Sequence, residues 1–207
     1  LLCANSISFR DSLYLLFERG KSMQESVPVG KGGMLAILGS EIKEIDNYIL
    51  EIKSNGVCEI ANDNAQGQII VSGNIEPIEE LKSILKKNRK KCISLPVSAP
   101  FHCSLMNPAA IKMEKKINAI NFKKPDYEII SNVTASPVSN PNDIKKLLIR
   151  QIYSKVRWRE SMLFIGENKI NDFIEIGPGK VLTGLNSKIL INKDGVVSSS
   201  IDKYESI

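Results

Sequence analysis

Hydrophobic and polar positions follow two different periods along this chain, which predicts a mixture of helices and strands. Residues 8–11 (Ser-Phe-Arg-Asp) have the pattern of a helix cap, and the apolar residues after them recur at helical spacing. We expect this first helix to end near Gln24, before Pro28. The glycine-rich segment 29–33 that follows has the composition of a hinge.

Residues 30–98 contain a recognisable series of elements. The pattern predicts strands at 34–38, 57–61, 68–72 and 92–97, and helices at 41–53 and 77–89. We expect a turn at 62–67 between the two middle strands, because this segment is rich in Asn, Asp and Gly. The order strand, helix, strand, strand, helix, strand is the split-βαβ, ferredoxin-like motif, so we expect a subdomain here.

The rest of the chain predicts alternating helices and strands, which is typical of a parallel sheet with crossover helices. Asn107 and Pro108 have the pattern of a cap and a first-turn proline. We expect the strand 173–176 to be short and buried and to turn, through 177–179 (Gly-Pro-Gly), into a helix. The other expected elements are a strand at 127–130, helices from 141, at 158–165 and at 180–191, and a last strand at 196–200.

The composition predicts a globular protein with one domain, or one domain that carries a smaller one. Hydrophobic residues make up 43% of the 207 residues, charged residues 25%, and the mean hydropathy is −0.09. No apolar run approaches the length of about 20 residues that a membrane span needs. The net charge of +5 favours acidic partners but is too small to indicate nucleic acid. The four cysteines form no C-x-x-C pair, so we expect reduced, mostly buried thiols and a cytoplasmic protein.

His102 is the only histidine of the chain, and it lies between the exit of an expected strand and the start of an expected helix. Histidine is the side chain whose ordinary pKa, about 6.5, suits a general base near neutral pH. The alternative is a histidine with a surface or structural role. With one histidine and no cysteine pair, a Cys/His zinc site is not expected.

Other polar residues have both a functional and a structural interpretation. Arg19 lies beside the apolar stripe of the first helix, where it either binds a carboxylate or phosphate or extends its head into water. Gln151 is expected to face inward, as part of a site or as a buried amide. The turn 177–179 either offers amides to an anion or is a plain tight turn. Asn62 and Asn64 either reach a polar ligand or serve the turn alone.

These residues do not form a complete catalytic set. Nucleophilic acyl transfer needs a serine or cysteine activated by the histidine, together with oxyanion donors. Cys103 and Ser104 are neighbours of His102 but are poorly placed to face its ring, and no G-x-S-x-G elbow occurs in the sequence.

Long motifs in order identify a family. They are residues 18–24 (ERGKSMQ), 95–102 (LPVSAPFH), 150–153 (RQIY) and 175–185 (EIGPGKVLTGL). Together they resemble the bacterial malonyl-CoA:acyl carrier protein transacylases of fatty-acid synthesis. The resemblance implies an α/β fold: an α/β-hydrolase-like parallel-sheet core, here incomplete, formed by residues 1–29 and 99–207, with an inserted ferredoxin-like βαββαβ subdomain at 30–98.

The resemblance also implies a reaction. A serine in a G-H-S-x-G elbow takes malonyl from malonyl-CoA as an ester and yields it to the phosphopantetheine thiol of acyl carrier protein. Malonyl-CoA and acyl carrier protein are therefore the expected partners, with no metal, cofactor, nucleic acid or membrane, and the complete protein is expected to be a monomer. His102 corresponds to the general base, and Arg19 to the arginine that binds the malonyl carboxylate. Gln151 corresponds to the residue whose main-chain carbonyl orients the histidine, and Asn62 and Asn64 to asparagines near the CoA cleft.

The chain departs from the family pattern at its start. The serine elbow and the G-Q-G oxyanion loop are expected upstream of Leu1, so we expect the chain by itself to be inactive and only marginally stable or prone to aggregate. One alternative is an inactive remnant of such an enzyme. Another is a ferredoxin-like binding module that reads RNA, which is disfavoured because strands 57–61 and 68–72 carry no aromatic residues.

Overall fold

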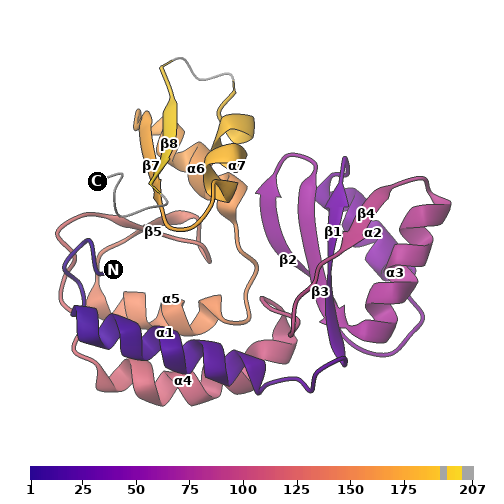
Figure 1. Cartoon of the computed structure of the whole chain (residues 1–207), viewed down its shortest axis with the longest axis horizontal. Helices are drawn as coiled ribbons and strands as arrows, with labels where there is room; N and C mark the ends of the chain where they lie inside the picture. Colours follow the sequence, from indigo (N-terminus) through magenta and orange to yellow (C-terminus); the bar gives the residue numbers. More distant parts are fainter. Residues whose placement is uncertain (192–194, 202–207) are drawn as a thin grey trace.

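The chain has an α/β fold, and the part that the structure describes contains helices and three separate groups of paired strands (Figure 1). The computed structural model describes residues 1–191 and 195–201, so parts of the expected core segment 99–207 lie outside the described residues. The elements in order are α1 (Phe9–Gln24), β1 (Gly32–Leu38), α2 (Ile42–Leu50), β2 (Cys58–Ala65), β3 (Gln68–Asn74), α3 (Ile75–Lys87), β4 (Lys91–Ser94), the 3-10 helix η1 (Ser104–Met106), α4 (Asn107–Ala119), β5 (Ile129–Ser131), β6 (Ser136–Val138), α5 (Pro141–Gln151), α6 (Trp158–Glu167), β7 (Asp172–Ile176), α7 (Val181–Ile189) and β8 (Val197–Ile201).

The elements predicted within residues 30–98 occur in the predicted order. Their four strands form one antiparallel sheet with the order β2-β3-β1-β4. Leu35 and Ile37 on β1 are fully buried in a cluster with residues of α2 and α3, so both helices cover the same face of the sheet (Figure 1). Met34 and Ile70 belong to a smaller cluster that includes Phe101, next to His102, so this sheet also supports the loop that carries the histidine.

The turn predicted at 62–67 is too long. Strand β2 continues through Ala65, with register shifts after Ile60 and after Asp63, and the tight turn is left to Gln66 and Gly67, where Gly67 has a φ of +68°. The backbone of Asp63 donates to Val156 across the molecule at 2.9 Å, and Val156 donates to Ala61 at 2.8 Å. These long-range bonds extend the strand through residues of low strand propensity.

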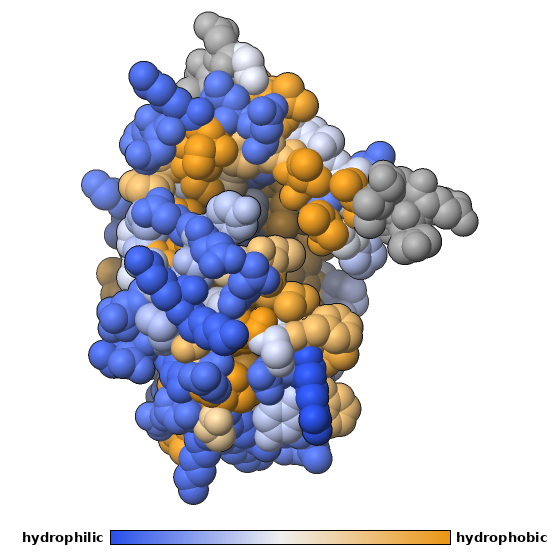
Figure 2. Space-filling model, turned by 90° about the vertical axis from the view of Figure 1, so that its left-hand side faces the viewer, coloured by the Kyte–Doolittle hydropathy of each residue, from blue (hydrophilic) through white to orange (hydrophobic). Residues whose placement is uncertain are grey.

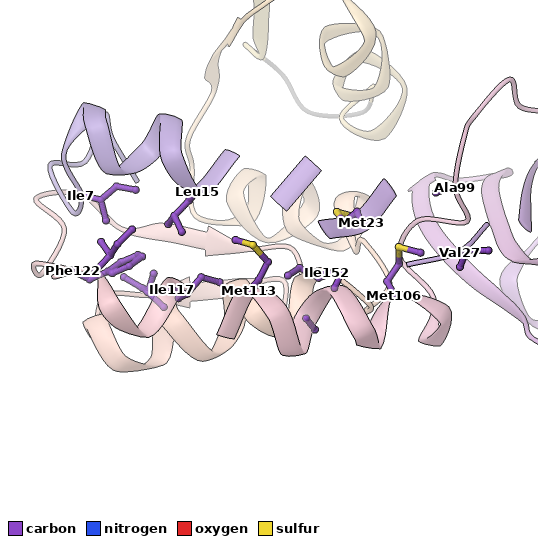
Figure 3. Close-up of a cluster of buried hydrophobic side chains, with 14 residues drawn as sticks. Ile7, Leu15, Met23, Val27, Ala99, Met106, Met113, Ile117, Phe122 and Ile152 are labelled. Atoms are coloured by element: carbon purple, nitrogen blue, oxygen red, sulfur yellow. The ribbon is translucent and has the colours of Figure 1, made fainter. Parts of the chain in front are cut away.

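A second core joins α1, α4 and α5 (Figure 3). Leu15 and Met23 of α1 meet Met113 and Ile117 of α4, and Ile152 follows directly after α5. Burial of each such side chain contributes about 1.5–3 kcal/mol. This core fixes the two helices that carry Arg19 and Gln151.

Helix α1 begins as predicted, because the Ser8 hydroxyl accepts a hydrogen bond from the backbone of Asp11 at 3.1 Å. The helix buries one face and exposes another that is equally apolar. The exposed residues, which we call the α1 stripe, are Phe9, Leu13, Leu16 and Phe17, with 52–69% of each side chain accessible. A stripe of this size on one helix is unusual unless another segment or partner covers it.

The C-terminal elements correct several expectations. Strand β7 pairs in parallel with β8, but it is not buried as predicted, since Ile174 is 61% and Ile176 74% exposed. Strands β5 and β6 form an antiparallel pair, and β6 was not predicted because it contains Pro137. Asn107 is the first residue of α4 and not its cap, because η1 leads directly into that helix. The thiols are not mostly buried either: only Cys103 is, while Cys3 is exposed.

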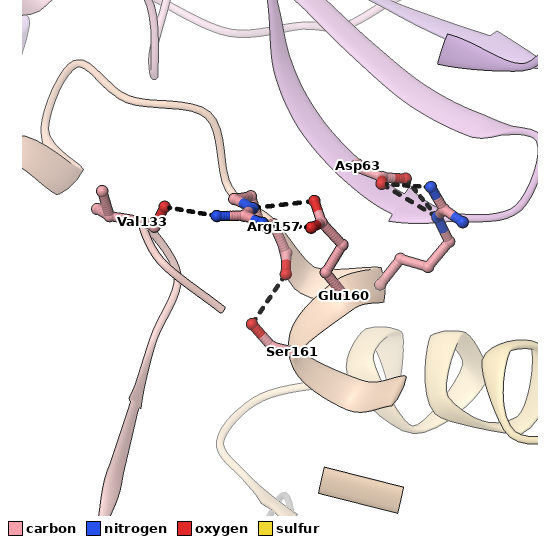
Figure 4. A network of polar contacts seen from close by, with 6 residues as sticks. Asp63, Val133, Arg157, Glu160 and Ser161 are labelled. Carbon is pink, nitrogen blue, oxygen red and sulfur yellow. Dashed lines mark hydrogen bonds and ion pairs between the residues drawn. The ribbon is translucent and has the colours of Figure 1, made fainter. Parts of the chain in front are cut away.

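An ion pair joins the four-stranded sheet to α6. Arg159 donates through Nε to both carboxylate oxygens of Asp63, at 2.9 and 3.0 Å, as the dashed lines at Asp63 in Figure 4 show. Asp63 is 1% exposed and Arg159 29%. Nearby, Arg157 binds Glu160 on α6 and the carbonyl of Val133, which ties the β5–β6 segment to the same helix (Figure 4).

We expect Arg159→Ala to lower the free energy of unfolding by about 3 kcal/mol, because the substitution leaves the buried Asp63 carboxylate without its partner. Urea unfolding followed by circular dichroism measures this change. The matched control is Lys146→Ala, which breaks the exposed pair with Asp143 and should cost less than about 1 kcal/mol. Equal effects of the two substitutions would contradict a stabilising role for the Asp63–Arg159 pair.

Candidate active site

His102 lies in the loop between β4 and η1, half-buried, with a φ of +60°. This left-handed conformation costs a residue other than glycine about 1 kcal/mol or more. Its ring atom Nδ1 is 3.1 Å from the main-chain oxygen of Gln151. Gln151 is the last residue of α5, and the carbonyl groups of a helix's last turn have no partner within the helix, so this oxygen is free to accept.

The contact with Gln151 determines which nitrogen of the neutral ring carries the proton. A carbonyl oxygen can only accept a hydrogen bond, so Nδ1 of His102 must donate. The neutral ring then has its lone pair on Nε2. A lone pair held in a fixed direction is what a general base needs in order to take a proton from a hydroxyl or thiol.

Burial lowers the pKa of His102 below its ordinary value of 6.5. Hydrogen bonding to the backbone of Gln151 and Ser154 opposes this effect, whereas the positive charge of Arg19 adds to it. The imidazole is therefore neutral, and able to accept a proton, at neutral pH.

Arg19 and Gln151 line the same cavity of about 410 Å³ between α1, α4 and α5. Most of the other lining residues are apolar, among them Leu1, Leu15 and Leu148. Burial lowers the pKa of Arg19, and no hydrogen-bonded or charged partner among the described residues opposes this effect. The cavity thus presents a cation to an apolar space, which suits a small ligand with a carboxylate or phosphate.

The neighbours of His102 do not supply a nucleophile. Cys103 is fully buried, and its thiol donates to the carbonyl of Pro100 at 3.1 Å. Burial raises the pKa of this thiol, which keeps it protonated and unreactive. The Ser104 hydroxyl donates to Glu59 at 2.6 Å and is engaged there. The nucleophile for a reaction based on His102 must come from elsewhere.

The remaining candidates are less connected to this centre. Asn62 and Asn64 are half-buried and lie on one face of β2, opposite to Asp63. The turn 177–179 leads into α7, but the amides of Leu182 and Thr183 donate to the Glu175 carboxylate at 3.1 and 2.8 Å. The Glu175 carboxylate therefore already binds the amides that follow this turn, so the structure favours a plain tight turn over an anion site.

The contact between Glu59 and Ser104, beside His102, is one that the sequence patterns did not predict. Glu59 lies within an expected strand, and no local pattern indicates that its side chain reaches a loop 45 residues later. In residues 1–191 and 195–201, no group of His, Cys, Asp and Glu side chains is arranged to hold a metal ion. Across the same ranges, none of the helices combines the length and hydrophobicity that crossing a membrane requires.

The chain is similar to named proteins along nearly its whole length, although no family model matches it. It is 41% identical over 191 residues to the malonyl CoA-acyl carrier protein transacylase of Bacillus subtilis, covering 91% of this chain and 60% of that protein. It is 35% identical to the protein of the same name from Staphylococcus aureus, covering 100% and 67%. A solved structure of a type II PKS acyl-carrier protein in complex with its malonyl-transacylase matches with a TM-score of 0.92 and 36% identity, covering 100% of this chain and 66% of that chain. The chain therefore spans 60–67% of the lengths of these relatives.

Proposed function

The chain belongs to the malonyl CoA-acyl carrier protein transacylase family, and from this we propose that it holds the base and the substrate-binding arginine of a malonyl transferase. The reaction moves a malonyl group from CoA to the thiol of an acyl carrier protein. The carrier protein is proposed as partner because the matching solved structure is a complex with one. The similarity gives no support to the alternative of an RNA-binding module.

The observation that carries the proposal is the contact between His102 Nδ1 and the Gln151 oxygen. It leaves Nε2 free to take the proton of a serine hydroxyl as the serine oxygen attacks the thioester carbonyl. The bond from carbon to sulfur then breaks, and the CoA thiolate takes the proton from the imidazolium. The same steps in reverse order pass the malonyl group from the serine ester to the carrier thiol.

Arg19 is proposed to bind the free carboxylate of the malonyl group. Arg19 lines the apolar cavity that Gln151 also lines, and its charge acts on His102. A carboxylate would supply the acceptors that this planar group lacks among its described neighbours. An acetyl group has no such carboxylate, so the interaction would favour malonyl.

We propose that the fold is an incomplete α/β-hydrolase-like core, formed by residues 1–29 and 99–207, with a ferredoxin-like subdomain at 30–98. The strand order β2-β3-β1-β4 and the two helices on one face support the second assignment. The parallel pair of β7 and β8, with a helix as their connection, supports the first.

The serine and the oxyanion donors are proposed to lie on a segment that packs against the exposed apolar surface. Hydrophobic residues gather in a hollow on the face that lies at the left of Figure 1 (Figure 2). Exposed large apolar side chains also occur along the α1 stripe and at Ile174 and Ile176 of β7. Without that segment we propose that the chain does not transfer malonyl.

The proposal is tested with the joined enzyme, in which residues 1–207 follow the part of the Bacillus subtilis relative that precedes the aligned region. Incubation with [14C]malonyl-CoA and a carrier protein bearing phosphopantetheine should give labelled carrier protein. A folded joined enzyme that labels neither its own serine nor the carrier would contradict the proposed function.

We expect Arg19→Ala in the joined enzyme to lower kcat/KM for malonyl-CoA by about 100-fold, because a hydrogen-bonded charge pair with the substrate is lost. The rate with acetyl-CoA, which lacks the carboxylate, should stay the same. Competition between the two labelled thioesters measures the preference. Arg10→Ala, at an exposed position of the same helix, is the matched control. An unchanged preference for malonyl in Arg19→Ala would rule out the assigned role.

A further inference from the structure

The backbone of His102 needs support from outside its own loop. Its φ of +60° is a conformation that persists in a residue other than glycine only where neighbouring contacts fix the chain. One such contact closes the turn itself, since the thiol of Cys103 donates to the carbonyl of Pro100 at 3.1 Å. This bond joins two residues of the same turn, so it does not fix the orientation of the turn relative to the rest of the protein.

The second support comes from the four-stranded sheet. Glu59, on β2, accepts two hydrogen bonds from Ser104, one from its backbone N–H at 2.9 Å and one from its hydroxyl at 2.6 Å. Ser104 is the first residue of η1, which leads into α4. Backbone N–H groups at the start of a helix lack partners within it, and Cys103, the residue at the cap position, supplies none from its side chain. Glu59 therefore caps η1 from a distant strand.

These contacts place His102 between two fixed points. Its ring is held by the Gln151 oxygen, and the chain two residues after it is held by Glu59. We propose that Glu59 is a positioning residue for His102. The Glu59 carboxylate fixes the start of η1 and thereby the direction of the His102 imidazole. The consequence for catalysis rests on the proposed function, whereas the effect on the ring does not.

The charge of Glu59 matters for this role. Hydrogen bonds to an ionised acceptor are shorter and about twice as strong as those between neutral groups. Glutamine at the same position keeps one acceptor oxygen and loses the charge, and alanine keeps neither. The ring should therefore be displaced most in Glu59→Ala and less in Glu59→Gln.

The test uses histidine NMR on this chain, in which the signals of His102 come from the only imidazole present. Long-range 1H–15N spectra above the pKa of the ring report which nitrogen carries the proton. In the unmodified chain Nδ1 should carry it, as the contact with Gln151 requires. Glu59→Ala should lose this preference and shift toward the Nε2–H form, and Glu59→Gln should retain most of it.

Two further variants keep the test decisive. Ser104→Ala removes the hydroxyl contact and keeps the backbone contact, so it should give a smaller shift in the same direction without touching the charge. Glu114→Ala, at an exposed position of α4, should give no shift. Nitrogen signals that stay unchanged in folded Glu59→Ala, or that change equally in Glu114→Ala, would overturn the proposal.

Kinetics of the joined enzyme separate this inference from the proposed function. A displacement of a catalytic group by about 1 Å costs about 100-fold in rate, so Glu59→Ala should lower kcat by that factor and leave KM for malonyl-CoA unchanged. A rise in KM at constant kcat would contradict positioning of the base. A joined enzyme that lacks transferase activity before any substitution would contradict the proposed function alone, since the NMR result still decides the role of Glu59.

Discussion

His102→Ala should lower the rate of malonyl-enzyme formation in the joined enzyme by about 10⁶-fold, the loss typical of removing the base of a serine-histidine pair. The physical reason is that no other described group near Gln151 has a lone pair suited to take the serine proton at neutral pH. Rapid-quench measurement of acid-stable label from [14C]malonyl-CoA gives the rate of this step directly.

A second substitution separates the base from its position. His102→Asn keeps a side-chain donor for the Gln151 oxygen but has no basic nitrogen, so we expect it to be as inactive as His102→Ala. Label that persists in both variants would reject the assignment of the base. Activity retained in His102→Asn alone would mean that the residue acts only by holding its loop.

The pH profile of the unmodified joined enzyme follows from the same residue. Burial lowers the pKa of His102 from 6.5, so the ring loses its basic lone pair only when the pH falls below that value. The acid limb of kcat/KM should therefore lie below pH 6.5, with a constant rate above it until another group titrates. An acid limb above pH 6.5 would contradict the depressed pKa.

The local sequence pattern was sufficient to predict most of the helices and strands and to select His102 as the candidate general base. The single histidine between a strand and a helix was visible in the sequence, and α1 and α5 lie close to where apolar spacing predicted them. The role of the Gln151 carbonyl came from family resemblance alone, because a main-chain oxygen leaves no mark on side-chain patterns.

The errors have a common physical origin in contacts between distant segments. Strand β2 extends through Asn62 and Asp63 because Val156 pairs with it, and Glu59 reaches Ser104 across 45 positions. Neither Val156 nor Ser104 can be identified as a partner from hydrophobic periodicity, because periodicity indicates only whether a position faces the hydrophobic core. Strand β7 was expected to be buried for the same reason: its apolar sequence indicates that something covers it, but not whether that cover lies within these 207 residues.

Joining the preceding segment should raise the rate of malonyl transfer by at least about 10³-fold over residues 1–207 alone, and by up to about 10⁶-fold. The chain alone contains His102 and Arg19 but no serine elbow, and its α1 stripe and the outward face of β7 remain in contact with water. Covering that apolar surface should also raise the unfolding midpoint in urea and reduce both self-association and the binding of an apolar dye such as ANS.

The matched control is a joined enzyme whose elbow serine is replaced by alanine. It should gain the same stability and the same decrease in dye binding as the joined enzyme, yet remain inactive, because the segment would cover the surface without supplying the nucleophile. If residues 1–207 alone transfer malonyl as fast as the joined enzyme, the nucleophile lies within the chain and the assignment of an external serine is wrong. If joining restores activity but leaves dye binding unchanged, the exposed face of α1 and β7 is not where the segment packs, and that part of the fold proposal fails.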